Sequence, residues 1–398
     1  MKNRLPQVAL LIGFSRNYRR GILHGIASYV RAHGPWSCFT PEQGLYGGVV
    51  PGWLGGWNGD GIIACIDSPR TAKALLRSNC PVIDVLHSAR FAGIPSFDTD
   101  AGAVAKLAAD NFLKAGFRHF AFCGFPGIPF SDRREAAYVN YLAAHRREVR
   151  VFTSRTGRTL PFDIPAAERH GIGRASAIVA WLQKLPRPLA LFACNDICGQ
   201  QVLNACRRHG IKVPEEVAVI GVDNDEVLCR LCDPPLSSVV PDTERLGFEA
   251  AALLDRMMKG RGGRVGPVKV PPLRVVERAS SDGVPLEDPI TAAALRYIRD
   301  HVGDGIAVKD VQSHVRRSRT DLEQRFRKHL NASVSAEIWR RRMDRVLSLL
   351  QQTDLPLSKI AAQSGFATDS HLCRSFKARF QKTPSAYRLS CKNRQRDW

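Results

Sequence analysis

The most constraining feature of this sequence is a change of pattern near Pro289. Before it, short apolar runs bounded by Gly, Asp or Asn alternate with longer amphipathic stretches, which is typical of βαβ units and a parallel sheet. After it, amphipathic segments follow one another with short turns between them, which predicts an all-α domain. A chain of 398 residues is long enough to bury more than one core.

The apolar runs of the first part predict buried strands, and the amphipathic stretches predict helices that cover them. Strands are expected at Val8–Gly13, Gly61–Ile66, Val82–Val85, His119–Cys123, Leu189–Cys194 and Val217–Val222. Helices are expected near Tyr18–Ala32, Thr99–Ala115, Arg134–His145, Ile172–Lys184, Ile197–His209 and Thr243–Met258. Because the alternation restarts after residue 118, we expect two doubly wound parallel-sheet subdomains.

The segment between this α/β part and the helical part predicts a boundary. Residues 268–276, interrupted by Pro271-Pro272, predict an edge strand, because proline cannot donate to a strand ladder. Residues 279–289 predict a linker, since their Ser, Asp, Gly and Pro favour neither a core nor a helix. The expected organisation is therefore an α/β domain at 1–278, a linker at 279–289 and a helical domain at 290–398.

The chain is basic, with a formal net charge of +21, and a basic surface attracts polyanions such as nucleic acid. Its first apolar run is short and lacks a signal-peptide cleavage site, and no stretch approaches the about 20 apolar residues of a membrane-spanning helix. We expect a cytoplasmic protein that associates with the nucleoid when it binds DNA, with no membrane partner.

The 11 cysteines lack framework spacing and are expected to stay reduced inside a cell. Cys229 and Cys232 form a single CxxC pair, and a metal would need a second pair, for which Cys194 and Cys198 are the candidates. The favoured interpretation is that these are small core residues. No metal and no cofactor is predicted.

Two segments after Pro289 repeat one design. In the first, a short helix at Val308–Val315 precedes a turn at Arg316-Arg317 and a second helix capped by Ser318, which is the arrangement of a helix-turn-helix. The second helix of such a unit lies in the major groove of double-stranded DNA.

The second segment has the same phase. A short helix at Leu357–Gln363 precedes a turn at Gly365-Phe366 and a helix capped by Thr368, and a long helix at Ala336–Gln352 joins the two units. Two units joined by a rigid helix are expected to enter successive major grooves on one face of a duplex.

The outward positions around the two second helices are the candidate DNA contacts. They are Arg316, Arg317, Ser318, Arg319, Thr320, Glu323, Gln324 and Arg327 in the first unit, and Thr368, Asp369, Ser370, Cys373, Arg374 and Lys377 in the second. Gln324 and Arg374 are the best base readers, since Gln suits adenine and Arg suits guanine. Phosphate contacts are expected from Arg316, Arg317, Arg340, Arg341, Lys382 and Arg388. For any one of them the alternative is a solvated charge.

Residues 289–388 resemble the DNA-binding domains of the AraC/XylS family. The resemblance rests on the segment 365–377, followed by Phe380, Thr383-Pro384 and Tyr387-Arg388. The chain departs from the family pattern at Gln381-Lys382, where Gly is frequent, and at Arg316-Arg317, which replace a small apolar pair. The resemblance implies a transcription regulator.

Polar residues after the predicted strands are candidate ligand contacts, because ligands bind at the carboxyl ends of strands in open α/β sheets. Carboxylates and amides bind hydroxyls in pairs, and aromatic rings stack on sugar faces, so the set predicts a polyol site. For each residue the alternative is a helix cap. The set is Phe14, Tyr18, Asp67, Ser131, Arg134, Asn195, Asp196 and Asp223.

The segments 192–196, 210–224 and 235–239 resemble the sensor domains of the LacI/GalR family and, more broadly, the type I periplasmic sugar-binding-protein fold. The resemblance implies that Asp196, Asp223 and Arg134 are sugar ligands, with Asn195 and Ser131 in support. Repressors of that family carry their DNA-reading helices before the sensor, whereas here the C-terminal part supplies them.

A sensor followed by an AraC-type domain resembles a family of sugar-operon regulators. That resemblance implies a pentose ligand such as xylose, a homodimer formed through the sensor domains, and activation of catabolic genes with RNA polymerase as a partner. Closure of the sensor around a sugar would then reposition the DNA-binding domains across the linker.

Three alternatives remain beside a sugar-responsive activator. Residue spacing leaves open whether such a regulator activates or represses. A transport-type binding protein conflicts with the missing signal peptide and the basic helical tail. A sugar-metabolising enzyme is disfavoured because the sequence has no P-loop, no Gly-x-Gly-x-x-Gly, no His-Glu-x-x-His and no Gly-x-Ser-x-Gly, and we predict a protein that is not an enzyme.

Overall fold

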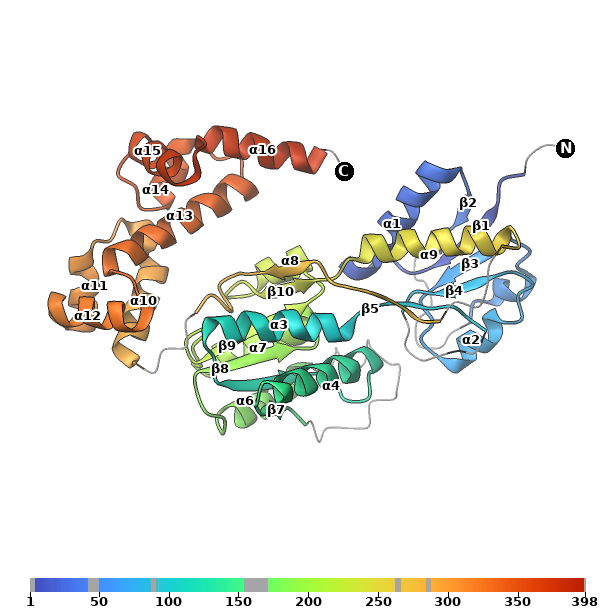
Figure 1. Cartoon of the computed structure of the whole chain (residues 1–398), viewed down its shortest axis with the longest axis horizontal. Helices are drawn as coiled ribbons and strands as arrows, with labels where there is room; N and C mark the ends of the chain where they lie inside the picture. The colour runs from blue at the N-terminus through green and yellow to red at the C-terminus, as the bar shows by residue number, and fades with distance from the viewer. Residues whose placement is uncertain are drawn as a thin grey trace. The chain divides into compact units, whose positions relative to one another are not determined.

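The computed structural model describes residues 4–41, 50–86, 91, 93–153, 171–261, 266–283 and 288–396. It divides the chain into two compact units, Met1–Pro285 and Leu286–Trp398. The first unit is α/β and the second is helical (Figure 1). Within the described ranges, no helix is both long and apolar enough to span a membrane.

The first unit contains two lobes, each built on its own parallel sheet. The N-lobe sheet has the strand order β2-β1-β3-β4, and helices cover both of its faces (Figure 1). Its elements are β1 (Gln7–Leu11), α1 (Asn17–His33), β2 (Ser37–Phe39), the 3-10 helix η1 (Gly52–Gly56), β3 (Gly61–Ala64), α2 (Pro69–Leu75), β4 (Val82–Asp84) and, from later in the chain, α9 (Thr243–Met258).

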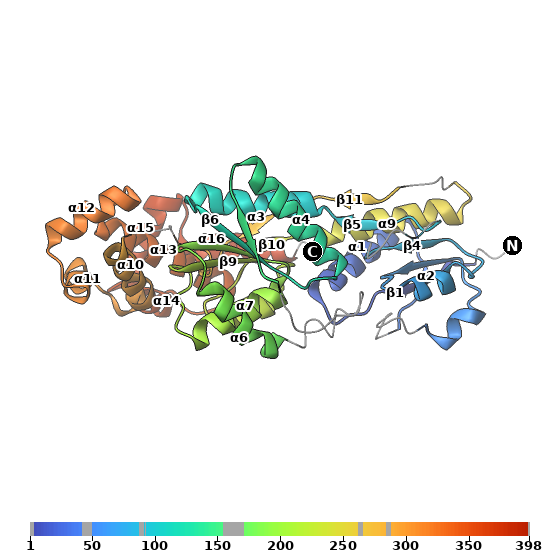
Figure 2. The same cartoon turned by 90° about the horizontal axis from the view of Figure 1, so that it is seen from below.

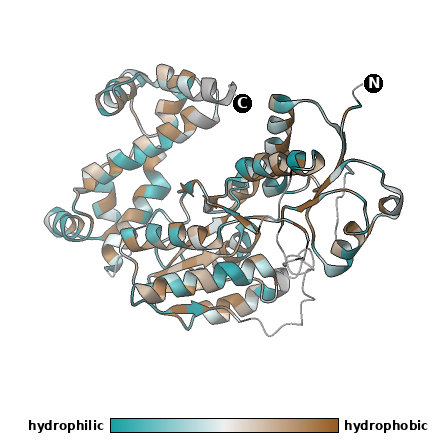
Figure 3. Cartoon of the chain, turned by 45° about the vertical axis from the view of Figure 1, so that its right-hand side comes forward, coloured by the Kyte–Doolittle hydropathy of each residue, from teal (hydrophilic) through white to brown (hydrophobic). Residues whose placement is uncertain are grey.

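Alternate residues of β1 fill the two cores of the N-lobe. Val8 and Leu10 join the core that contains α1 and α9, whereas Ala9 and Leu11 join the core that contains α2 and η1. A strand covered on both faces needs apolar residues at every position. This is why the apolar runs predicted these strands, and the strands are brown in Figure 3 while the helices carry both colours.

Helices α1 and α9 approach each other closely because glycine lies at the contact. A Cβ added to Gly25 would lie 1.9 Å from the carbonyl oxygen of Glu244, and one added to Gly247 would lie 2.0 Å from that of Ile22. Side chains larger than hydrogen would therefore force these helices apart. The packing joins the first helix of the chain to a helix more than 200 residues later.

The C-lobe sheet has the order β12-β10-β9-β8-β6-β7, with β12 antiparallel to β10. Its core is a single apolar cluster. The elements are α3 (Ala101–Ala115), β6 (His119–Cys123), α4 (Pro129–Ala144), β7 (Val149–Val151), α6 (Gly171–Leu182), β8 (Leu189–Ala193), α7 (Asp196–Arg208), β9 (Val217–Val222), α8 (Glu226–Leu231), β10 (Ser237–Val240) and β12 (Arg274–Val276). The two doubly wound parallel sheets expected from the sequence are confirmed.

A third, two-stranded sheet of β5 (Phe97–Thr99) and β11 (Val268–Val270) continues the N-lobe (Figure 2). The single edge strand expected at 268–276 is wrong, because Pro271-Pro272 divide it. The part before the prolines pairs with β5, and the part after them pairs with β10 in the C-lobe. The chain thus crosses between the lobes after β5, after β10 and after β11.

The first unit extends past residue 279, where the sequence predicts that the linker begins. Ser280 and Ser281 are buried, and Ser280 donates to the carbonyl oxygen of Val219 and accepts from the backbone N–H of Ser237. Ser281 donates to Oγ of Ser237 at 2.7 Å, so both serines are held to the C-lobe. Residues 284–287 of the expected linker lie outside the described residues.

The second unit is built from helices around two small cores. One core draws on Ile298, Val311, Leu322 and Phe326, and the other on Ile360, Phe366, Leu372 and Phe376. Helix α13 contributes to both. The elements are α10 (Pro289–His301), η2 (Val302–Asp304), α11 (Val308–Val315), α12 (Arg319–Leu330), α13 (Val334–Gln352), α14 (Leu357–Gln363), α15 (Asp369–Phe380) and α16 (Pro384–Arg396).

The two helix-turn-helix units repeat in detail. Ser318 caps α12 by accepting from Asp321 N–H, and Thr368 caps α15 by accepting from His371 N–H, so both predicted caps are confirmed. Each helix also ends on a left-handed residue, Asn331 at φ 49° and Gln381 at φ 55°. Gln381 thus adopts the backbone conformation that glycine favours, which explains how the chain departs from the family pattern without losing the turn.

Candidate functional site

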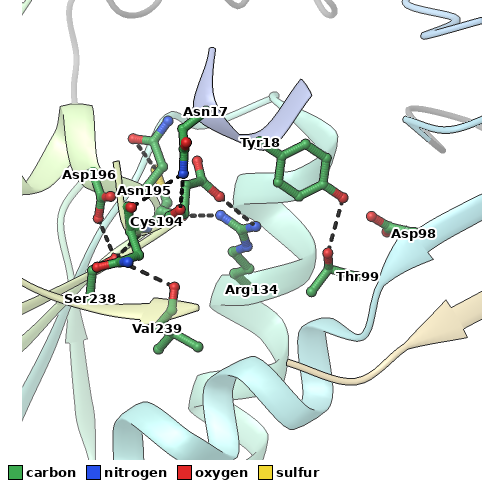
Figure 4. A network of polar contacts seen from close by, with 12 residues as sticks. Asn17, Tyr18, Asp98, Thr99, Arg134, Cys194, Asn195, Asp196, Ser238 and Val239 are labelled. Atoms are coloured by element: carbon green, nitrogen blue, oxygen red, sulfur yellow. Dashed lines mark hydrogen bonds and ion pairs between the residues drawn. The ribbon is translucent and has the colours of Figure 1, made fainter. Parts of the chain in front are cut away.

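The candidate effector site lies where strand ends of the N-lobe and the C-lobe face each other (Figure 4). Asn17, at the start of α1, donates from Nδ2 to the carbonyl oxygens of Asp223 and Asn224, at 3.3 Å in each case. Tyr18 places its hydroxyl 3.0 Å from Oγ1 of Thr99 on β5. The first turn of α1 therefore touches both the loop after β9 and the crossover strand β5.

Arg134 is the centre of this network. It lies in the first turns of α4 and is only 7 % exposed. Its Nη1 donates to the carbonyl oxygen of Cys194 at 2.5 Å, and its Nη2 lies 3.7 Å from Oδ1 of Asp223. From the helix that follows β6, one guanidinium therefore contacts the segments after β8 and β9, which leave the carboxyl ends of neighbouring parallel strands.

Charged groups around Tyr18 influence its hydroxyl. Burial raises the pKa of the Tyr18 hydroxyl far above its usual value, and the charges of Asp98 and Asp223 raise it further, whereas Arg134 lowers it. The hydroxyl is therefore a neutral donor and acceptor at physiological pH. Together with the carboxylate of Asp223 and the guanidinium of Arg134, it forms a set that can bind vicinal hydroxyl groups.

A second ion pair, which sequence reasoning missed, ties the crossover to the C-lobe. Arg133 donates from Nη2 to Oδ2 of Asp98 at 2.9 Å. Burial raises the pKa of the Asp98 carboxyl, and Arg133 and Arg134 oppose that rise. The three-residue strand Phe97–Thr99 has too little apolar periodicity for the sequence to predict it, and Asp98 falls between the predicted elements.

Asp196 is engaged by the protein itself. It is buried, and its carboxyl group accepts from Ser238 Oγ at 2.6 Å and from Asp225 N–H at 2.8 Å. Burial, followed by the charge of Asp223, raises the pKa of Asp196 from 3.8 to about 8. Its oxygens therefore hold the loop after β9 against β10, beside the network of Arg134.

Two other predicted ligands also hold loops. Asn195 caps α7 by accepting from Cys198 N–H at 2.9 Å, and Ser131 is fully buried and accepts from Phe125 N–H at 2.9 Å. Ser131 lies on α4, as Arg134 does, and Asn195 directly follows Cys194. These contacts order the wall of the candidate site.

The remaining predicted residues lie in the N-lobe. Phe14 follows β1 and is 42 % exposed. Asp67 follows β3, is buried, and accepts from Thr71 Oγ1 at 3.4 Å. The structure thus brings Tyr18, Arg134 and Asp223 directly together, and places Asp196, Asn195 and Ser131 immediately around them.

The candidate DNA surface is formed by α12 and α15 with the turns before them. Most of the predicted contacts are exposed, which leaves them accessible to a duplex. The exposed residues are Arg316, Arg317, Ser318, Arg319, Thr320, Gln324, Arg327, Thr368, Asp369, Ser370, Arg374 and Lys377.

Two members of the predicted set are half-buried. Glu323 is half-buried and accepts from Val334 N–H at 3.4 Å, so it lies against the start of α13. Cys373 is also half-buried, and burial raises the pKa of its thiol.

The basic residues predicted as phosphate contacts fall into two groups. Arg316, Arg317, Arg340 and Lys382 are exposed, although Arg340 also pairs with Glu337 and Asp344. Arg341 pairs with the buried Glu337 at 3.0 Å, and Arg388 donates to the carbonyl oxygen of Leu355 at 2.7 Å. Arg341 is thus engaged within α13, and Arg388 ties α16 to the segment that follows α13.

Family models match most of the chain. The XylR N-terminal domain matches residues 7–101, the periplasmic binding protein-like domain matches 109–281, and a helix-turn-helix domain matches 313–390. These matches confirm the predicted order of an α/β sensor-type domain before a helix-turn-helix domain.

Curated relatives cover nearly the whole chain. The xylose operon regulatory protein of Escherichia coli is 30 % identical over 96 % of this chain and 96 % of its own length. That of Haemophilus influenzae is 29 % identical over 98 % of this chain and 100 % of its own.

Solved structures agree with the fold. A structure of the xylose-binding transcription activator xylR matches 98 % of this chain and 99 % of its own length with a TM-score of 0.79 and 29 % identity. A cellobiose complex of the regulator CelR matches 71 % of this chain and 86 % of its own length, with a TM-score of 0.55 and 22 % identity, and supports the fold of the first unit.

Proposed function

This chain belongs to the family of xylose operon regulatory proteins, and from that premise we propose that it controls genes of pentose catabolism in response to D-xylose. It is a regulator that binds DNA through its helix-turn-helix domain. The observation that carries the sugar assignment is the meeting of Tyr18, Arg134 and Asp223 at the facing strand ends of two lobes.

The sugar is proposed to bind through paired contacts to its hydroxyls. Asp223 accepts from one hydroxyl, Arg134 donates to another, and the neutral Tyr18 does either. The exposed ring of Phe14 covers an apolar face of the sugar, and Asp67 reaches it from the end of β3. Asp196, Asn195 and Ser131 keep the three contact residues in place, since their own polar atoms are used within the protein.

Binding between the lobes is proposed to close them, because the chain crosses between them at three places that can act as a hinge. A sugar shifts this equilibrium only by its difference in affinity for the open and closed states. The closed form is proposed to present the DNA-binding domains of a homodimer differently from the open form.

DNA reading is assigned to the two exposed helix faces. Gln324 and Arg374 read base edges, and Arg316, Arg317 and Lys382 hold phosphates. We propose activation as the sign of regulation, with RNA polymerase as a partner, because the full-length structural relative is described as a transcription activator. The proposed location is the cytoplasm, on the nucleoid when DNA is bound.

Calorimetry on the full chain tests the effector assignment. D-xylose, L-arabinose, D-ribose, D-glucose and D-galactose are titrated into the wild-type protein and into Asp223→Asn, with Arg207→Ala as the control. Arg207 pairs with Asp233 on the exposed surface of the same lobe, so its loss leaves the site intact. Saturable heat with D-xylose that Asp223→Asn removes is the expected result, and no heat with any of the five sugars contradicts the assignment.

A further inference from the structure

The two helix-turn-helix units touch at a second place besides the helix that joins them. The turn 302–306, which follows α10, packs against the turn 363–366, which follows α14. A Cβ added to Gly365 would lie 2.2 Å from the carbonyl oxygen of Val302 and 3.2 Å from Cα of Gly305, and one added to Gly303 would lie 2.9 Å from the carbonyl oxygen of Gln363. We call this contact the junction.

Arg342 holds the junction from the middle of α13. Its Nη2 donates to the carbonyl oxygen of Ile306 at 2.8 Å, and its guanidinium lies 5.8 Å from the centre of the Phe366 ring. Ile306 belongs to the core of the first helix-turn-helix unit, and Phe366 belongs to the core of the second helix-turn-helix unit. One side chain therefore contacts both helix-turn-helix units, and it is half-buried.

A single connecting helix leaves two bodies free to bend and twist about it, whereas a second fixed contact removes that freedom. Helix α13 provides the first connection and the junction provides the second. Glycine is required on both sides, because Gly305 and Gly365 have φ values of 73° and 74° and the two turns approach backbone to backbone.

We infer that the junction, held by Arg342, fixes the angle between α12 and α15 and so sets the half-site spacing that this protein accepts on DNA. The inference rests on the proposed function, since it assumes that both helices read one duplex. Helices that enter successive major grooves lie about one helical turn, or 10 base pairs, apart. Each base pair added between the half-sites turns one of them by about a tenth of a turn about the DNA axis, and a rigid pair of helices cannot follow.

The test begins by selecting duplexes from a random pool with the wild-type full chain. Affinity is then measured on the selected site, on versions with one base pair inserted or removed between its half-sites, and on each half-site alone. For the wild type we expect one dominant spacing and a loss of at least about tenfold on changing it. A wild type that selects no duplex contradicts the proposed function itself.

Arg342→Met keeps an unbranched side chain but removes the donors. We expect it to bind each half-site alone as the wild type does and to reduce the spacing penalty at least about threefold, whereas Arg342→Lys, which keeps a donor, restores part of the penalty. Lys309→Met removes an exposed positive charge from the same domain and is expected to leave the penalty unchanged. An unchanged penalty in Arg342→Met, or an equal reduction in Lys309→Met, overturns the inference.

A second variant decides the question if Arg342→Met no longer binds a half-site. Gly303→Ala leaves every side-chain hydrogen bond in place and places a methyl group 2.9 Å from the Gln363 carbonyl oxygen, which pushes the two turns apart by a few tenths of an ångström. The expected result is a weaker or displaced spacing optimum with unchanged half-site sequences. The same optimum and the same penalty as in the wild type would refute the role of the junction.

Discussion

Nη2 of Arg134 lies 3.7 Å from Oδ1 of Asp223, and the loop that presents this carboxylate has an unusual backbone. Asp223 has φ 106° and the following Asn224 has φ 44°, values that residues with side chains rarely adopt. Asn17 of the opposite lobe donates to both of their carbonyl oxygens. A strained loop held at fixed places is typical of a site that is ordered before its ligand arrives.

Removing either member of this pair should weaken effector binding. Asp223→Asn and Arg134→Ala each lose a charge-assisted hydrogen bond to the sugar, and we expect an affinity lower by about 10- to 100-fold. Calorimetry measures it, and thermal unfolding confirms that the variants are folded. Asp233→Asn, at an exposed ion pair of the same lobe, is expected to bind as the wild type does. Equal affinity in Asp223→Asn and Asp233→Asn would mean that the sugar lies elsewhere.

The buried Asp196 predicts a pH dependence of stability. Folding raises its pKa from 3.8 to about 8, so between these values the folded protein holds a proton that the unfolded chain releases. The contribution of this proton to the free energy of unfolding is complete below pH 3.8. It declines as the pH rises toward 8 and is lost above that value, with a slope of at most about 1.4 kcal/mol per pH unit.

Asp196→Asn removes this titration, because an amide resembles the protonated carboxyl group. Urea unfolding of the full chain from pH 5 to pH 8 should show a shallower decline in the free energy of unfolding for the variant than for the wild type. Other carboxyls with raised pKa values, such as Asp98, remain in both proteins and cancel in the difference. Parallel curves would show that Asp196 is ionised in the folded state.

The close packing of α1 and α9 predicts a sensitive position at Gly25. Gly25→Ala brings a methyl group against the Glu244 backbone, and overpacking of this kind costs about 1–3 kcal/mol or more. Gly52→Ala is the matched control, since a Cβ at Gly52 would meet no atom within 4 Å. Thermal unfolding should show a lower midpoint for Gly25→Ala alone. Similar midpoints for both variants would contradict the interhelical contact.

The two kinds of DNA contact should be separable by salt. Arg374→Ala is expected to cost about 1–3 kcal/mol on the selected site and to relax the base preference at one position. Lys382→Ala is expected to weaken binding to all sequences alike and to reduce the salt slope by about 1. Anisotropy titrations at several salt concentrations measure both. A salt slope that falls equally in the two variants, with base preference retained, would place Arg374 on a phosphate.

The sequence predicted the long, doubly covered strands because nearly all of their residues are apolar and buried, as in β1 and β6 after their first, exposed residue. It missed β10, whose Ser237 and Ser238 are buried. Their hydroxyls are satisfied by Ser281 and by Asp196, partners more than 40 residues away. Hydropathy cannot indicate a polar residue that is buried through a distant hydrogen bond.

The same reason limited the prediction of the site. The expectation that loops after parallel strands meet at one edge grouped Arg134 with Asp223, and the structure places these two side chains 3.7 Å apart. Position in the sequence could not distinguish Asp223, which faces Arg134, from Asp196, whose carboxyl oxygens accept hydrogen bonds from Ser238 and Asp225. The helix-turn-helix units were predicted more fully, since caps, turns and apolar positions there are local in sequence.

The most direct test of the account is the affinity of the full chain for its selected duplex with and without D-xylose. We predict that the sugar changes this affinity by about 10-fold or more, within the usual range of coupling between two sites. Asp223→Asn is predicted to keep the sugar-free affinity and to lose the response. Equal affinity with and without D-xylose, in a protein that binds the duplex, would contradict the claim that the sensor domain couples a pentose to DNA binding.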